Sequence, residues 1–191
     1  MMLPSKITGN KTVDESILIA ISLGVICALG PFKIDFAAGL PTTLQSLLVV
    51  WFALAFGLRV GLTSVLAYLV LGGLGFGVFS GGASGWQHFI GSNGGFLLAF
   101  PVGAFIAGSL EQMASFFTLF TKAKFISSAF ILLISQTAIL ALGLMWQSML
   151  VGEIISLGII MDIFLPGLLI KTAIGTLALV IITRVLTRIK S

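Results

Sequence analysis

Charged side chains are scarce in this chain. Only 8% of its 191 residues are Asp, Glu, Lys or Arg, whereas 58% are hydrophobic, and an ordinary soluble domain is about 25% charged. The mean hydropathy is correspondingly high, at +1.21. This composition excludes a soluble domain and indicates an integral membrane protein. The net charge of +4 is too small and too scattered for a surface that binds nucleic acid.

Residues that support common catalytic chemistry are also scarce. Cys27 is the single cysteine and lies in an apolar run, which excludes an internal disulfide and favours a small packing residue. His88 is the single histidine and has no cluster of Cys, His or Asp beside it, so we expect no metal site. The sequence contains no P-loop, no HExxH motif and no nucleophile–base pair, so the chain is not expected to be an enzyme or to hydrolyse ATP by itself.

The apolar residues form separate runs divided by Gly, Pro and isolated charges. Several runs are shorter than the roughly 20 residues that a membrane crossing needs, and others lengthen through the loops. We predict one domain, residues 1–191, folded as an all-α bundle of six transmembrane helices behind a polar segment at 1–15. The expected helices cover residues 16–32, 42–58, 60–71, 94–110, 125–145 and 166–184, with a loop at 33–41 and a broken segment at 146–165.

Lys and Arg are distributed unevenly between the two sides of this bundle. The two termini and the loops after the second and fourth helices carry Lys6, Lys11, Arg59, Lys122, Lys124, Arg184, Arg188 and Lys190. The other loops carry only Lys33, with Lys171 just inside the sixth helix. By the positive-inside tendency, both termini are cytoplasmic. The loops richest in Gly and Pro then lie outside, and the sequence predicts a pocket on the outer face.

The third and fourth helices are joined by a glycine-rich outer loop, at about 72–93. Glycine is unfavourable inside a helix by about 1 kcal/mol relative to Ala, and irregular backbone at membrane depth is tolerated where it lines a cavity. The alternation of glycines with aromatic and amide groups favours a binding loop that includes Gly81, Gly82 and Trp86. The alternative is a flexible connector.

Three polar side chains are candidates to hold a ligand. Lys171 follows closely on Pro166–Gly167, so it lies near the positive end of the last helix, where a carboxylate would bind. Asn93 and Gln45 both donate and accept hydrogen bonds, as a neutral polar head group requires. The alternatives are a lysine that extends to the membrane surface and amides that cap helices or bond across the bundle.

Aromatic side chains and small side chains complete the pattern. Tyr68, Phe79 and Trp86 would wall an apolar slot, although Trp86 is equally suited to anchor the chain at the interface. Small residues recur every fourth position in the first helix, at Ser16, Ala20, Gly24 and Ala28, and in the fourth, at Gly95, Ala99, Gly103 and Ala107. Such rows let helices approach closely in lipid. We assign the fourth-helix row to packing within the bundle, whereas the first-helix row suits either packing or a docking face for a partner subunit.

Several ordered motifs resemble one known family. Leu40-Pro41-Thr42-Thr43-Leu44-Gln45 is similar to the opening motif of the BioY family, the biotin-binding S components of energy-coupling factor (ECF) vitamin transporters. The similarity covers roughly 40–108 and 160–175. It continues through Arg59-Val60-Gly61, Tyr68–Gly72, Phe79–Gly82, Gly94–Pro101 and Phe164–Lys171.

The resemblance implies six helices with cytoplasmic termini in a prokaryotic cell membrane, with biotin held near the outer face. Its partners would be a transmembrane T component, which meets small residues of the first helix such as Ala20, Gly24 and Ala28, and two ATPase subunits, which alone use ATP. No cofactor is implied. Lys171 would pair with the biotin carboxylate, and Asn93, Gln45 and the glycine-rich loop would contact the ring end.

One position departs from the family pattern. Leu168 stands where relatives carry an aspartate three residues before the lysine. This difference leaves open a second carboxylated vitamin or small molecule as the ligand. Two alternatives remain. A membrane-embedded enzyme would need a nucleophile–base pair, which the sequence lacks, and a scaffold without a ligand does not explain why polar groups gather in the outer loops.

Overall fold

The computed structural model describes residues 8–36, 40–116, 124–154, 158 and 160–190. Its α-helices are α1 (Lys11–Leu29), α2 (Gln45–Phe56), α3 (Leu58–Gly73), α4 (Gly94–Phe116), α5 (Lys124–Val151) and α7 (Leu165–Lys190). Two strands, β1 (Lys33–Phe36) and β2 (Leu40–Thr43), and the short helices η1 (Ser80–Gly82), η2 (Trp86–Phe89) and η4 (Ile160–Phe164) complete the described elements. By length and composition, α1, α4, α5 and α7 can each cross a membrane, and α2 and α3 are shorter apolar helices.

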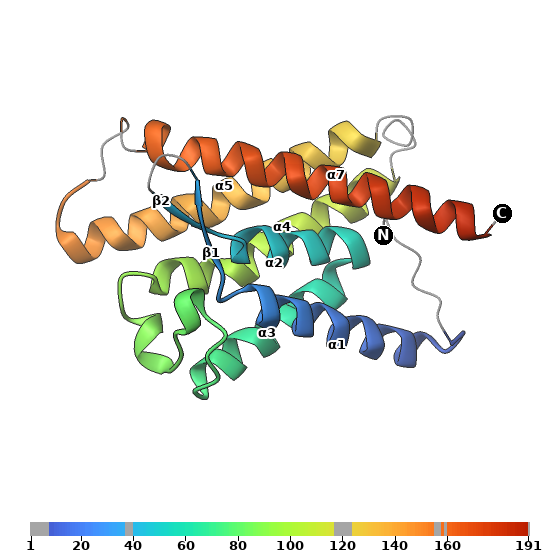
Figure 1. Cartoon of the computed structure of the whole chain (residues 1–191), viewed down its shortest axis with the longest axis horizontal. Helices are drawn as coiled ribbons and strands as arrows, with labels where there is room; N and C mark the ends of the chain where they lie inside the picture. Colours follow the sequence, from blue (N-terminus) through green and yellow to red (C-terminus); the bar gives the residue numbers. More distant parts are fainter. Residues whose placement is uncertain (1–7, 37–39, 117–123, 155–157, 159, 191) are drawn as a thin grey trace.

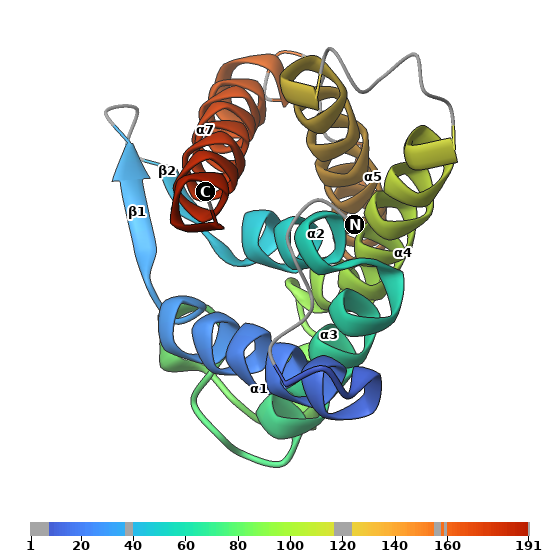
Figure 2. The same cartoon turned by 90° about the vertical axis from the view of Figure 1, so that its right-hand side faces the viewer.

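The helix α2 forms the centre of the bundle. Viewed along the helices, the other five surround it (Figure 2), and α2 contacts every one of them. Val49, Val50 and Ala53 in α2 have no exposed surface. A helix that is hydrophobic on all sides is stable only when it is enclosed, which explains the central position of this short uncharged segment.

The helices extend further than the apolar runs that predict them. α1 begins at Lys11, where the Asn10 side chain accepts a hydrogen bond from the Thr12 amide at 3.1 Å. Residues 11–15 are therefore helical, and the prediction that the helix begins only at residue 16 was wrong. Likewise α4 continues past Glu111, which is only 6% exposed. In both places polar residues interrupt the hydrophobic pattern without ending the helix, and at α1 the Asn10 side chain caps the helix start.

A β-hairpin occupies the segment that we predicted to be a loop. β1 and β2 pair in antiparallel register, with Lys33 opposite Thr43 and Phe36 opposite Leu40. The all-α prediction is therefore wrong for this segment. Two strands of four residues are too short for alternation of side chains to distinguish them from a loop.

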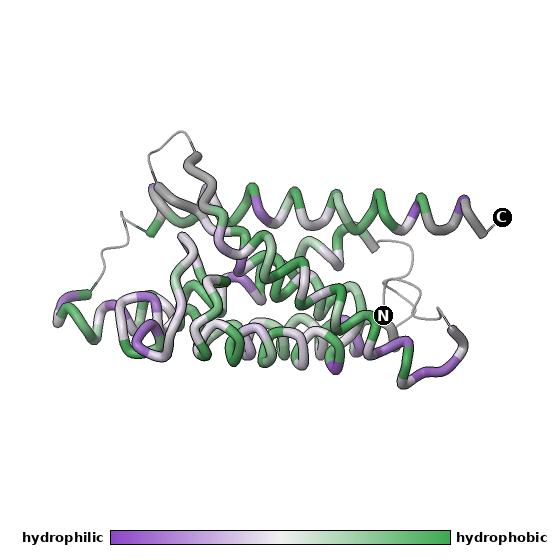
Figure 3. The backbone as a smooth tube through the Cα atoms, turned by 60° about the horizontal axis from the view of Figure 1, so that its bottom comes forward, coloured by the Kyte–Doolittle hydropathy of each residue, from purple (hydrophilic) through white to green (hydrophobic). Residues whose placement is uncertain are grey.

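The two ends of the bundle differ in character. α1 begins and α7 ends at one end, whereas the segment that joins α3 to α4 lies at the other (Figure 1). Hydrophobic residues dominate the helices between the ends, and hydrophilic residues gather toward the ends (Figure 3). This arrangement is typical of a bundle whose middle lies in hydrocarbon.

The two rows of small residues have different surroundings. In α4, Ala99 and Ala107 are buried, and a side chain on Gly103 would collide with Ile139 of α5. The predicted packing of this row within the bundle is confirmed. In α1, all members of the row are exposed, and no atom lies within 4 Å of the position that a Cβ of Gly24 would take. The described part of the chain therefore does not use the first row for internal packing.

Candidate functional site

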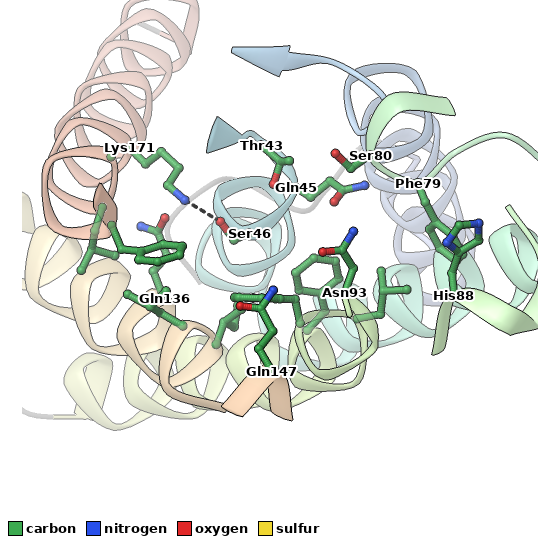
Figure 4. Close-up of a pocket in the computed structure, with 18 of the residues that line it drawn as sticks. Thr43, Gln45, Ser46, Phe79, Ser80, His88, Asn93, Gln136, Gln147 and Lys171 are labelled. Atoms are coloured by element: carbon green, nitrogen blue, oxygen red, sulfur yellow. Dashed lines mark hydrogen bonds between the residues drawn. The ribbon is translucent and has the colours of Figure 1, made fainter. Parts of the chain in front are cut away.

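A cavity of about 230 Å³ lies at the end of the bundle opposite the start of α1. Its wall is formed by α2, α4, α5 and α7, by the segment that joins α3 to α4, and by the end of β2 (Figure 4). The described lining residues are Thr43, Gln45, Ser46, Phe79, Ser80, Ala83, His88, Asn93, Phe96, Leu97, Phe100, Gln136, Ile139, Leu140, Gln147, Phe164, Gly167, Leu168 and Lys171.

Two helices begin at this cavity. Gln45 is the first residue of α2, and Asn93 immediately precedes α4. Gly167 lies in the first turn of α7, but the π-helical turn η4 leads into α7 without a break, so the first amides of α7 do not form a free helix start. The start of a helix carries partial positive charge and N–H groups that have no partner within the helix. The wall of the cavity is therefore electropositive even before its side chains are considered, and it suits an anionic group.

Lys171 adds a full positive charge to the same wall. It lies in the second turn of α7, and its Nζ donates a hydrogen bond to Ser46 Oγ at 2.9 Å (Figure 4). The described lining residues include no Asp or Glu. A half-buried ammonium in such surroundings lacks a fixed counter-ion, so a carboxylate on a ligand would be its natural partner.

Four carboxamide side chains also line the cavity: Gln45, Asn93, Gln136 and Gln147. Each provides two N–H donors and a carbonyl acceptor. Gln45 is held from behind, because its Nε2 donates to the Tyr68 hydroxyl at 2.6 Å and that hydroxyl donates to the Val78 carbonyl at 3.0 Å. The cavity therefore matches a ligand with neutral donors and acceptors next to an acidic group.

Aromatic side chains form the apolar part of the wall. The buried Phe79 ring packs edge-on against Tyr68, with 5.6 Å between ring centroids. Gly72 allows this position, because a side chain there would overlap the Phe79 ring. Phe96 and Phe100 face the cavity from α4. An apolar body with a few directed polar groups is typical of a small-molecule site.

The structure brings three of the predicted ligand-binding residues together. Gln45, Asn93 and Lys171 come from separate parts of the sequence and meet at the cavity. Tyr68 is fully buried behind the wall and is not among the described lining residues. Its position instead fixes Gln45.

In the glycine-rich loop, the predicted wall residue Phe79 does line the cavity, whereas Gly81, Gly82 and Trp86 do not. Gly81 and Gly82 have φ angles of 73° and 76°, which other residues rarely adopt, and the turn they make is closed by a hydrogen bond from the Phe79 amide to the Ala83 carbonyl. Trp86 is 56% exposed and packs against Gly73 and Phe89. None of these three is among the described lining residues, whereas Phe79 and Ala83 are.

Several lining residues were not anticipated from the sequence. Gln136 lies within the apolar stretch of α5, and a polar group at such a depth is itself a signal of function. Ser46, His88 and Gln147 carried no comparable signal, because serine and amides are common near helix ends. His88 stands in edge-on contact with Phe79, and the described residues contain no group of three Cys, His, Asp or Glu that would hold a metal.

Similar proteins cover most of the chain. "Probable biotin transporter BioY" of Pyrococcus horikoshii is 32% identical over 135 residues, which make up 71% of this chain and 70% of that protein. "Biotin transporter BioY2" of Lactococcus lactis subsp. cremoris is 35% identical over 138 residues, or 72% of this chain and 71% of that protein.

A solved structure has the same fold. It is the S-component for biotin from an ECF-type ABC transporter, and it superposes with a TM-score of 0.75 over 95% of both chains at 24% sequence identity. The sequence model of the BioY family matches residues 5–188. This match spans nearly the whole protein, and the chain therefore belongs to the BioY family.

Proposed function

We propose that this chain is the substrate-binding membrane subunit of a biotin uptake system in a prokaryotic cell. It takes biotin at the outer face and passes it inward together with an ATP-driven ECF module of one T component and two ATPase subunits. The observation that carries the proposal is the cavity, in which one ammonium, four carboxamides and an aromatic wall converge and no described carboxylate intervenes.

The chemistry of biotin fits this set of groups. Its carboxylate suits Lys171, and its ureido ring has two N–H donors and one carbonyl, which complement carboxamides such as Gln45 and Asn93. Its sulfur-containing ring and aliphatic chain suit the aromatic wall. The family membership and the names of the relatives support biotin as the ligand.

A second ligand class has one observation in its favour. Leu168, which replaces the aspartate expected from the family resemblance, lines the cavity and is 6% exposed. A leucine there makes the wall more apolar and removes an acceptor. A carboxylated small molecule with a less polar ring, such as lipoate, is therefore the competitor that binding experiments should include.

The two ends of the bundle support a membrane orientation. α1 begins and α7 ends at the same end, and Lys11 and Arg59 lie there too, both paired with Glu15. The positive-inside tendency supports cytoplasmic termini and six crossings, with the cavity open to the outside. The exposed row Ala20, Gly24 and Ala28 on α1 supports docking of the T component at this face.

Calorimetric titration of the detergent-purified protein tests this proposal. Biotin and its uncharged methyl ester are compared in the wild type, in Lys171→Ala, and in Lys11→Ala as the matched control at the other end of the bundle. We expect Lys171→Ala to weaken biotin binding by roughly a hundredfold, because a buried charge loses its partner. The ester is expected to bind both proteins about equally.

Each result has a distinct meaning. Tight binding of lipoate with no binding of biotin by the wild type would refute biotin as the ligand. If Lys171→Ala lowers the affinities for biotin and for its ester equally, biotin remains the ligand, but Lys171 does not pair with its carboxylate. Lys11→Ala is expected to behave as the wild type, since Lys11 is a surface residue far from the cavity.

A further inference from the structure

Gln136 is the most deeply buried of the polar groups that line the cavity and lie within a helix. It belongs to α5, is 2% exposed, and lies well inside the helix, away from both of its ends. Burial of a primary amide is unfavourable unless both its nitrogen and its oxygen find partners. The hydrogen-bond partners of Nε2 and Oε1 therefore indicate what Gln136 does in the cavity.

The orientation of the Gln136 amide is determined by two acceptors. Its Nε2 donates to Thr172 Oγ1 at 3.2 Å and to the Leu132 carbonyl at 3.4 Å. The Thr172 hydroxyl has its own proton committed to the Leu168 carbonyl at 2.8 Å, so it can only accept from Gln136. A flipped amide would place its oxygen against these acceptors, which excludes the alternative orientation.

The other atom of the amide, Oε1, has no hydrogen-bond partner and is fully buried. An unsatisfied buried acceptor is unfavourable. In Figure 4 the Gln136 side chain extends toward the side of the cavity where the end of Lys171 and Ser46 lie. The residue that fixes Gln136, Thr172, is the next residue in the chain after Lys171.

Lys171 provides the matching donor. An ammonium has three protons and no acceptor, and Ser46 Oγ takes one of them. Since the described lining residues include no carboxylate, the carbonyl oxygen of a nearby amide is a suitable second acceptor. Figure 4 shows the end of Lys171 on the side of the cavity toward which the Gln136 amide extends, and the lysine side chain is flexible enough to reorient its ammonium.

We propose that Gln136 is a positioning residue for Lys171: its Oε1 accepts a second hydrogen bond from the ammonium when Lys171 binds the acidic group of the ligand. Ser46, Gln136 and the ligand carboxylate then take the three ammonium protons. Gln136 thereby replaces a fixed counter-ion with a neutral acceptor, which orients the lysine without competing for the anionic ligand. This inference rests on the proposed function.

The test is a double-mutant cycle between Gln136→Met and Lys171→Ala, read by titration with biotin and biotin methyl ester. Gln136→Met should weaken biotin binding by roughly tenfold, the usual effect of losing a hydrogen bond to a charged group. It should leave the affinity for the ester unchanged. In the Lys171→Ala background the same substitution should change biotin affinity by less than about twofold.

A control and a second variant accompany the cycle. Gln147→Met makes the same chemical change on the same helix and in the same cavity, and any effect it has should persist in the Lys171→Ala background. Thr172→Val removes the hydroxyl that orients Gln136 while conserving its shape, so it should lower biotin affinity in the same direction, and Thr172→Ser should restore it. Thr172→Val keeps the inference testable if Gln136→Met does not fold.

Two outcomes would overturn the inference. If Gln136→Met lowers the affinities for biotin and the ester equally, and adds to Lys171→Ala, then Gln136 contacts an N–H of the ligand directly and does not act through Lys171. If Gln136→Met binds biotin as the wild type does, Gln136 has no part in binding. Failure of the wild type to bind biotin would overturn the proposed function first, and this inference with it.

Discussion

Tyr68 shows how a single buried hydroxyl links the core to the site. Its ring has no exposed surface and packs against Phe79, while its hydroxyl joins the Gln45 amide to the Val78 carbonyl. A buried tyrosine needs a hydrogen-bond partner for its polar end. Here that requirement connects α3, the start of α2 and the loop behind the cavity, so the residue that we predicted as part of the wall acts instead as its support.

Tyr68→Phe is expected to weaken biotin binding several-fold and to destabilise the protein by about 1–2 kcal/mol, because the Gln45 nitrogen and the Val78 carbonyl lose a buried partner. Titration with biotin and thermal unfolding in detergent measure the two effects. Thr176→Val is the control, since it removes another buried hydroxyl, one that donates to the Thr172 carbonyl of its own helix. It should lower stability and leave binding unchanged. Unaltered binding in Tyr68→Phe would contradict a supporting role for the hydroxyl.

At the scale of elements, α1 presents two faces with different roles. Leu18, Ser22 and Ile26 are buried against the bundle, whereas the small residues that include Ala20 and Gly24 face outward. Small exposed residues on an apolar helix allow a second helix to approach closely. In the proposed transporter this face meets the T component, so the element that contributes nothing to the described cavity wall would couple it to the energy source.

Gly24→Leu on α1 is therefore expected to separate binding from transport. Because no atom lies within 4 Å of a Cβ at this position, the variant should fold and bind biotin as the wild type does. Uptake of labelled biotin by cells that contain the complete ECF module should fall to background. Ile21→Leu changes an exposed residue outside the row and should transport normally. Undiminished uptake by Gly24→Leu would show that the T component does not dock on this face of α1.

At the scale of the whole molecule, the direction of the helices assembles the cavity. α2, α4 and α7 all begin at the cavity end and run away from it, while α1 begins at the opposite end (Figure 1). The positive ends of α2 and α4 and the ammonium of Lys171 therefore converge on one end of the bundle. The same arrangement leaves Lys11 and Arg59 at the other end, which under the proposed orientation is the cytoplasmic one.

Labelling of cysteines in intact cells tests this orientation. In a Cys27→Ala background, a cysteine at Glu153, an exposed position just after α5, should react with a membrane-impermeant maleimide. A cysteine at Lys11 should react only after the membrane is opened. The reverse result would invert the bundle and place the cavity on the cytoplasmic side. Equal labelling of both positions in sealed cells would contradict a membrane-spanning arrangement altogether.

The sequence by itself determined the class of protein, the apolar helices and the family. These depend on composition, on runs of residues close together in the chain, and on ordered motifs such as the one ending in Lys171. It also indicated that Gln45, Asn93 and Lys171 are candidates, because isolated polar groups beside apolar helices are conspicuous. The exact helix ends and the β1–β2 hairpin escaped prediction, because capping and short strand pairing leave no periodic pattern.

Only the tertiary structure decided which of these side chains meet. The contact between Lys171 and Ser46 joins residues 125 positions apart, and no local pattern reports such a pairing. In the structure Trp86, which we predicted to be a wall residue, lies outside the described cavity wall, whereas Gln136, which we did not predict, lines it. The physical reason is that helix faces are assigned by packing around α2. The sequence gives the type of each residue. Whether its side chain points into the cavity or toward the lipid depends on which helices surround it.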